Sequence, residues 1–296
     1  MILKLGDTGE FVAVLQELLN INVDGIFGNK TKTAVIYFQR KNKLEVDGIV
    51  GPMTWKKLDF NLIEHHLDTD RKSYANWIED YHLPEGQYVR ESTSKYYIVG
   101  HHTAGRENPY KTIDHWAQDN RGRVGTNYVI GGISVDGKNN EHDGKILRAI
   151  DDEFYGWHIG AGANLLVKKK SISFELCSAG GLTEKNGKWY TWFGEEVIES
   201  QVCVLKNKFR GYQAFHKYSE EQLKSLEALL RFLSKKHNID IKNGMQVWLN
   251  NGVNAFEINL EAALGKVKGL LSHTNFRKDK SDLFPQPELI QLIKNL

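Results

Sequence analysis

Residues 96–102 read YYIVGHH, a short apolar run that ends in two histidines, His101 and His102. A run of this length and composition predicts a buried strand. Residues 172–177 read ISFELC, in which apolar and polar side chains alternate, so we predict a second strand with Glu175 on its polar face. Apolar residues elsewhere after residue 95 recur at helical spacing. This alternation predicts an α/β domain, with a mixed central sheet flanked by helices.

Further elements extend this pattern. Residues 127–130 read NYVI and residues 268–273 read KGLLSH, so we predict two more strands, the second ending on His273. Residues 219–222 read SEEQ, which matches a capping box at the start of a long helix. A last helix is predicted to begin near Pro287.

The first 58 residues contain an internal repeat. Residues 23–28 read VDGIFG and residues 46–51 read VDGIVG. Each Asp-Gly pair favours a turn, because glycine accepts a positive φ and aspartate can bond its own backbone. Helical spacing before, between and after these turns predicts three short helices and therefore a small all-α N-terminal domain. We expect Phe27 and Tyr37, which lie near the turns, to belong to its core.

Length and composition limit the functions that the chain can have. Its 296 residues suffice for two domains, and 41% hydrophobic with 26% charged residues are ordinary for a globular protein. The 39 Lys and Arg residues nearly balance the 37 Asp and Glu residues, which argues against a dedicated nucleic-acid-binding protein. No apolar run approaches the roughly 18 residues of a membrane helix, so we expect no membrane insertion. The two cysteines, Cys177 and Cys203, are expected to be free thiols.

The histidines at the strand ends suggest a metal site. A catalytic zinc ion needs three protein ligands and an open position for water. His101 and His273 are two candidate ligands, and a carboxylate soon after His273 would be the third. The stretch from 273 to 282 offers such a carboxylate together with a lysine. His102 is expected to point to the opposite face of the strand and to have a structural role.

Four segments resemble the zinc N-acetylmuramoyl-L-alanine amidase family, which includes phage lysins and peptidoglycan recognition proteins. They are HHTA at 101–104, GWHIGAG at 156–162, SISFEL at 171–176, and the closing pattern of His273 followed by Lys280-x-Asp282. The resemblance covers residues 95–296, in the order that the family has.

The resemblance implies a role for each matched residue. The implied zinc ligands are His101, His273 and Asp282, the implied catalytic residues are Glu175 and Lys280, and the residues expected to contact substrate are Thr103, Trp157 and His158. The gap from His273 to Asp282 differs from the family's spacing, so Asp279 is a rival third ligand. Asp282 is preferred, because a lysine two residues before the ligand suits stabilisation of an oxyanion.

The N-terminal repeat carries a second resemblance. LGDTG at 5–9, VLQ at 14–16 and FQ at 38–39, together with the paired turns, resemble the three-helix peptidoglycan-binding domain of cell-wall hydrolases. We therefore expect a peptidoglycan-binding domain over residues 1–60, a linker over 61–94 and an amidase domain over 95–296. His65 and His66, in the linker, are expected to be exposed to solvent rather than to bind metal. Residues 243–266 look like an insertion of unassigned role.

These resemblances imply a hydrolase that binds peptidoglycan and cleaves the amide between N-acetylmuramic acid and L-alanine, with zinc-activated water. The sequence does not reveal the oligomeric state, and a monomer is the expectation. The first residues lack the layout of a signal peptide. We therefore expect a phage lysin, made in the cytoplasm and released to the wall through a separate pore, with a bacterial enzyme exported by another route as the alternative. The alternatives are a non-catalytic wall-sensing protein of the same fold, and a zinc hydrolase that cuts another bond of the wall.

Overall fold

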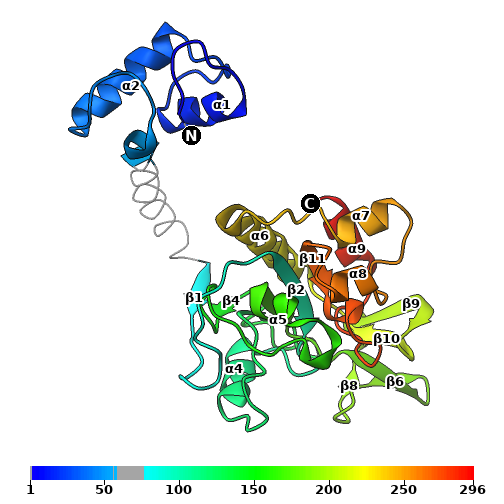
Figure 1. Cartoon of the computed structure of the whole chain (residues 1–296). Coiled ribbons are helices and arrows are strands. Elements are labelled where there is room, and N and C mark those ends of the chain that lie inside the picture. Colours follow the sequence, from blue (N-terminus) through cyan, green and yellow to red (C-terminus); the bar gives the residue numbers. More distant parts are fainter. Residues whose placement is uncertain (1, 56, 59–76) are drawn as a thin grey trace. The chain divides into compact units, whose positions relative to one another are not determined.

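The computed structural model describes residues 2–55, 57–58 and 77–296, and the chain divides into two compact units, Met1–Asn76 and Trp77–Leu296 (Figure 1). Each unit is described by itself. His65 and His66 of the predicted linker lie outside the described residues. Residues 77–94 belong to the second unit, where a strand at 78–80 joins the sheet and Leu83 is buried.

The N-terminal unit is helical, as the sequence predicts. It contains α1 (Glu10–Leu18), α2 (Asn29–Lys41) and further helical residues at 52–55 and 57–58. Its apolar core includes Phe27, which is fully buried. Tyr37 is 69% exposed, so the expectation that it belongs to the core is wrong. Tyr37 lies on the face of α2 opposite Val35 and Gln39, which are the buried residues around it.

The second unit is built on a six-stranded mixed sheet of order β1-β4-β3-β5-β2-β11 (Figure 1). The strands are β1 (Ile78–Asp80), β2 (Tyr97–His102), β3 (Tyr128–Ile130), β4 (Ile146–Arg148), β5 (Ser171–Leu176) and β11 (Gly269–Ser272). β3, β5, β2 and β11 are mutually parallel, whereas β4 runs antiparallel to β3. Every residue of β2 and of the edge strand β11 is buried, as expected for parallel strands covered on both faces.

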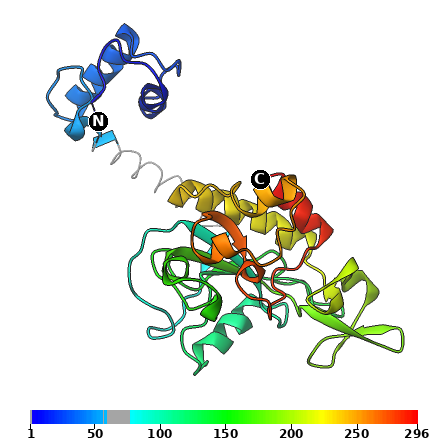
Figure 2. The same cartoon turned by 45° about the vertical axis from the view of Figure 1, so that its right-hand side comes forward.

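Helices cover both faces of this sheet, which confirms the predicted α/β architecture (Figure 2). The helices are α4 (Pro109–Ala117), α5 (Leu165–Lys170), α6 (Glu220–His237), α7 (Met245–Asn250), α8 (Leu260–Ala263) and α9 (Pro287–Lys294). On one face, leucines of α6 and α9 join Ile98 and Ile172 in the largest apolar cluster. On the other face, Tyr97 and Val99 pack with α5 and α8.

A second sheet, which the sequence did not predict, lies between β5 and α6 in the chain. Its order is β8-β7-β6-β10-β9, and every pairing in it is antiparallel. The strands are β6 (Gly181–Lys185), β7 (Lys188–Tyr190), β8 (Glu196–Val197), β9 (Val202–Phe209) and β10 (Tyr212–His216). It stands beside the larger sheet in both views (Figures 1 and 2).

Three further features concern the stretch 243–266, the cysteines and the composition of the helices. Residues 243–266 contain α7 and α8, and Met245 and Phe256 of this stretch are buried in the largest apolar cluster. Cys177 and Cys203 are both free thiols, as expected. Among the described residues, no helix combines the length and the apolar composition that a membrane crossing requires.

Candidate active site

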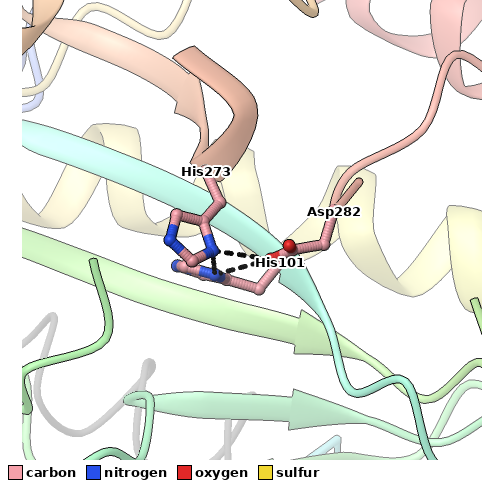
Figure 3. A group of neighbouring side chains, drawn as sticks. All are labelled: His101, His273 and Asp282. Carbon is pink, nitrogen blue, oxygen red and sulfur yellow. Dashed lines mark hydrogen bonds and ion pairs between the residues drawn. The ribbon is translucent and has the colours of Figure 1, made fainter. Parts of the chain in front are cut away.

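Three potential metal ligands meet where two parallel strands end (Figure 3). His101 lies near the end of β2, and His273 begins the short helix η3 (His273–Asn275) directly after β11, the neighbour of β2. His101 Nδ1 and His273 Nδ1 are 3.0 Å apart, and each lies 2.9 Å from Asp282 Oδ2. All three residues are buried, and the atoms form a single group with room for one shared ion.

Hydrogen bonds with Ser272 hold the three potential ligands in place. The Ser272 hydroxyl accepts from the Thr274 N–H at the start of η3 and from the Leu283 N–H at 3.0 Å. Asn275 Oδ1 accepts from the Ser272 N–H at 2.8 Å, which completes a capping box around the turn. The bond to Leu283 brings the preceding residue, Asp282, back to the end of β11.

The ring nitrogens have one consistent arrangement of protons. His273 Nε2 lies 3.2 Å from the carbonyl of Ile159, so Nε2 carries the proton and Nδ1 offers a lone pair. His101 Nε2 lies 2.8 Å from His158 Nδ1, and His158 Nε2 lies 2.8 Å from Ser171 Oγ. If each of these Nε2 atoms donates, then His101 Nδ1 is also bare.

The chemistry of this donor set fits a metal cation. Without a cation, the two unprotonated ring nitrogens and the carboxylate oxygen would direct three lone pairs at one another, with no hydrogen between them. Burial alone would raise the pKa of Asp282, yet the two histidines beside it hold this pKa far below its ordinary value, so the carboxylate is ionised. Burial also lowers the pKa of His101 to about 4, which keeps its ring neutral. Two neutral imidazoles and one carboxylate are a ligand set that zinc accepts.

Glu175 lies beside this group. It occupies the position of β5 that is paired with His101 of β2. Burial and the negative charge of Asp282 raise the pKa of Glu175 to about 8, and Lys280 opposes this rise. A carboxyl group whose pKa lies near neutrality is suited to accept and return a proton.

These residues share a cleft of about 520 Å³, which we call the histidine cleft. The structure brings all eight residues singled out from the sequence to its lining: Thr103, Trp157, His158, Glu175, Lys280 and the three potential ligands His101, His273 and Asp282. The lining also includes Trp116 and Arg121, which sequence reasoning missed. Trp116 lies on α4 and Arg121 follows shortly after the helix. Their spacing in the sequence does not indicate that they line a cleft at the strand ends.

The rival ligand Asp279 does not join the group of potential metal ligands. Its carboxylate is paired with Arg277, whose Nε donates to Asp279 Oδ1 at 3.0 Å, and the side chain is 62% exposed. His102 lies outside this group of ligands: it also lines the histidine cleft, but its Nδ1 is 2.8 Å from the hydroxyl of Tyr218.

Comparisons with known proteins match the two units separately. A model of the family described as N-acetylmuramoyl-L-alanine amidase matches residues 92–252, and a model described as putative peptidoglycan binding domain matches residues 8–58. An uncharacterized protein of Kitasatospora aureofaciens is 49% identical over 65 residues, which are 20% of this chain and 55% of that protein. The chain thus spans about half the length of this curated relative.

Solved structures also resemble parts of the chain. A peptidoglycan-binding protein from Clostridioides difficile is 40% identical over 20% of this chain and 40% of that chain, with a TM-score of 0.19. The structure of PlyL is 13% identical over 73% of this chain and 96% of that chain, with a TM-score of 0.42.

Proposed function

The chain belongs to the N-acetylmuramoyl-L-alanine amidase family, and on that premise we propose that it is a zinc-dependent amidase of bacterial peptidoglycan. The bond cleaved would be the amide between the lactyl group of N-acetylmuramic acid and L-alanine. The observation that carries the proposal is the convergence of His101, His273 and Asp282 in a cleft that also holds Glu175. The match of residues 8–58 to a peptidoglycan-binding domain supports the same substrate.

Zinc bound by these three side chains would supply a Lewis acid that polarises the scissile carbonyl and lowers the pKa of water. Glu175 accepts the proton of the attacking water and transfers it to the leaving amine. The charge of Asp282 is one cause of the raised pKa of Glu175, so a cation beside Asp282 favours the ionised base. Lys280 places a positive charge where the tetrahedral oxyanion develops.

The walls of the histidine cleft orient the substrate and the ligands. Thr103 and Trp157 line the cleft, where they contact the muramyl peptide. His158 lines the cleft too, but its bond to His101 gives it a second role, that of positioning a metal ligand. The wider role of a phage lysin stays a prediction of the sequence, as does the monomeric state.

The first experiment measures the loss of turbidity of a purified peptidoglycan suspension, with chelator and then with zinc added back. We expect clearing that stops with chelator, returns with zinc and releases new N-terminal alanine. Clearing with a different new terminus would reject this bond as the target. A folded, zinc-loaded protein that clears no wall type would instead be a wall-sensing protein.

A variant tests the role of the base. Glu175→Ala is expected to bind zinc as the wild type does and to lose turnover, because the metal ligands stay in place. Glu184→Ala, at an exposed position of β6, is the matched control and is expected to keep full activity. Loss of zinc from Glu175→Ala would contradict the role given to this residue.

A further inference from the structure

Trp192, in the turn between β7 and β8, is an exposed tryptophan that the proposed mechanism does not use. It is 72% exposed, whereas the other tryptophans in the described part of the chain are partly buried. An indole left in water forgoes the free energy that the burial of a large apolar side chain contributes. Exposure alone does not make a binding site, because single apolar side chains are common on protein surfaces. Trp192, however, is also held in a fixed place.

The indole of Trp192 is fixed beside the histidine cleft. Its Nε1 donates to the carbonyl of Ala104 at 2.7 Å, and Ala104 lines the histidine cleft. The ring of Phe193 packs edge to face with the indole, with the ring centres 5.3 Å apart. The one polar atom of the indole is thus occupied within the protein, and the part that stays exposed is the apolar ring.

The turn that carries Trp192 is closed by its own hydrogen bonds. The Thr191 N–H donates to the Glu195 carbonyl at 2.9 Å, and the Glu195 N–H donates to Thr191 Oγ1 at 3.0 Å. The turn is also joined to the loop after β2, because Arg106 Nη1 lies 2.6 Å from Glu195 Oε1 and the guanidinium carbon lies 5.0 Å from the centre of the Phe193 ring. A side chain held in this way loses little freedom when it binds a ligand.

The loop that accepts this hydrogen bond is part of the histidine cleft. The Thr103 N–H donates to the Leu176 carbonyl at 3.1 Å, and the Gly105 N–H donates to the Ser178 carbonyl at 3.0 Å, so the loop is held at the end of β5. Thr103 and Ala104 line the cleft on this side. The second sheet therefore places an apolar ring at the edge of the cleft.

The substrate of the proposed reaction brings sugars to this edge. The scissile carbonyl belongs to the lactyl group, which is attached directly to the sugar ring of N-acetylmuramic acid. When this carbonyl reaches the potential metal ligands, the glycan strand must lie at the mouth of the cleft. A pyranose ring has a flat face of C–H groups, which complements the negative face of an aromatic ring. The stem peptide, built of small and charged residues, has no apolar face of this kind.

We propose that Trp192 is a platform on which a sugar ring of the glycan strand stacks while the histidine cleft holds the scissile amide. Trp192 does not itself line the cleft, so the stacked ring is a neighbour of the sugar that bears this amide. The inference rests on the proposed function, because it concerns the glycan of the polymer that the cleft would cut. Trp192 thereby favours a polymer over a muramyl peptide with a single sugar.

The kinetic test gives the full chain two soluble substrates, an N-acetylmuramyl tripeptide with one sugar and uncross-linked glycan strands that carry the same stem peptide. Trp192→Ala is expected to lower kcat/KM on the strands about tenfold, mainly through KM, and to leave kcat/KM on the single-sugar substrate unchanged. Trp192→Phe keeps an aromatic ring but removes the N–H that bonds Ala104, and it is expected to keep most of the rate on the strands. Leu260→Ala, at a position that is also 72% exposed and lies outside the cleft, is the matched control.

Two kinetic outcomes would overturn the proposal. If Trp192→Ala and Trp192→Phe slowed both substrates alike, the indole would serve only to fasten the loop. If Trp192→Ala cleaved the strands with the kcat/KM of the wild type, no sugar would stack on Trp192 during the reaction.

A second readout does not depend on turnover. The indole ¹H–¹⁵N NMR signal of Trp192, identified by its loss in Trp192→Phe, is expected to shift when tetra-N-acetylchitotetraose, an uncharged chain of N-acetylated sugars, is added. The free stem tripeptide is expected to leave this signal unchanged. A signal that responds only to the tripeptide would overturn the proposal.

This readout separates the sugar platform from the amidase. A protein that cleaves peptidoglycan while the Trp192 signal ignores millimolar sugar probe would refute the platform and leave the amidase intact. A protein whose Trp192 signal responds to the probe but that cleaves no wall would support the platform and refute the amidase.

Discussion

The ring of His158 determines which nitrogen of His101 can hold a metal. If His101 Nε2 donates to His158 Nδ1, which lies 2.8 Å away, the Nδ1 of His101 is left with a lone pair toward Asp282 and His273. His158 is held in turn by Ser171 Oγ at 2.8 Å. Partners of this kind around a ligand commonly change metal affinity about 10–100-fold when they are removed.

We therefore predict that His158→Phe lowers the affinity for zinc by about 10–100-fold, because His101 Nε2 loses its acceptor. Competition with a chromogenic zinc chelator measures this affinity. His115→Phe, at an exposed position of α4, is the control and should leave the affinity unchanged. Unchanged zinc affinity with an increased KM in His158→Phe would instead mean that His158 contacts substrate only.

The site residues that could be predicted from the sequence are those that lie in strands or in motifs. His101 and Glu175 stand out because each lies in an apolar strand, and parallel pairing then places them side by side. The choice between Asp279 and Asp282 depends on a hydrogen bond from Leu283 to Ser272, which spacing does not predict. The hydrogen bond between His101 and His158 joins residues 57 positions apart, so no local sequence pattern predicts it.

At the scale of the element, the two copies of the N-terminal repeat form the same side-chain hydrogen bonds. Gln16 Nε2 donates to Asp24 Oδ1 and to the Ile26 carbonyl, at 2.7 and 3.0 Å. In the second repeat, Gln39 Nε2 donates to the corresponding atoms of Asp47 and Ile49, both at 2.8 Å. Each glutamine is 1% exposed and holds one Asp-Gly turn against its helix.

We predict that Gln39→Leu lowers the free energy of unfolding of the N-terminal unit by about 2–4 kcal/mol, because the Gly48 N–H and the Ile49 carbonyl lose their partner. Scanning calorimetry of the full chain should show one transition moving down. Gln16→Leu should have a similar effect, whereas Tyr37→Ser, at an exposed position, should have almost none. Equal stability of Gln39→Leu and wild type would refute the structural role of the paired glutamines.

A buried aspartate joins the sheet to the longest helix. Asp152 is 3% exposed, and it lies 2.8 Å from both Lys236 Nζ and His237 Nε2 of α6 and 2.5 Å from the hydroxyl of Tyr128 in β3. Burial alone would raise the pKa of Asp152, but these partners hold it well below its ordinary value. The folded state therefore favours the ionised carboxylate, which stabilises the fold at any pH above the unfolded pKa of about 3.9.

We predict that Asp152→Asn costs about 3–5 kcal/mol at pH 7, the usual effect of removing one partner of a buried ion pair. The difference from wild type should persist at pH 5 and shrink below about pH 4, as the wild-type contribution is lost toward the folded pKa. Urea denaturation at several pH values measures it, with Glu153→Gln, at an exposed neighbouring position, as control. A difference that grows in acid would contradict this account.

The elements that the sequence predicted are those with strong apolar patterns, such as β2 and β5. The second sheet was not predicted from the sequence, because most residues of its strands are exposed. In β9, for example, only Leu205 and Phe209 are buried. The capping box at α6 is only half formed. Ser219 Oγ accepts from the Gln222 N–H at 2.9 Å, but Gln222 Nε2 instead donates to the carbonyls of Ile130 and Cys177.

At the scale of the whole molecule, each unit has an apolar core of its own. The core cluster of the N-terminal unit consists of residues between 3 and 58. The four clusters of the second unit consist of residues between 77 and 296. All residues that line the histidine cleft belong to the second unit. The cleft thus needs no side chain of the N-terminal unit for its construction.

We predict that a chain of residues 77–296 folds and cleaves soluble muramyl peptides with a kcat/KM within about twofold of the full chain. On insoluble peptidoglycan it should be slower, because a second binding unit raises the local concentration of the enzyme at the wall. Initial rates on both substrates measure this contrast, with Gln39→Leu in the full chain as a variant that weakens only the N-terminal unit. If the shortened chain lost its rate on soluble substrate while remaining folded, the N-terminal unit would have to act in the chemical step, and the assignment of catalysis to residues 77–296 alone would be wrong.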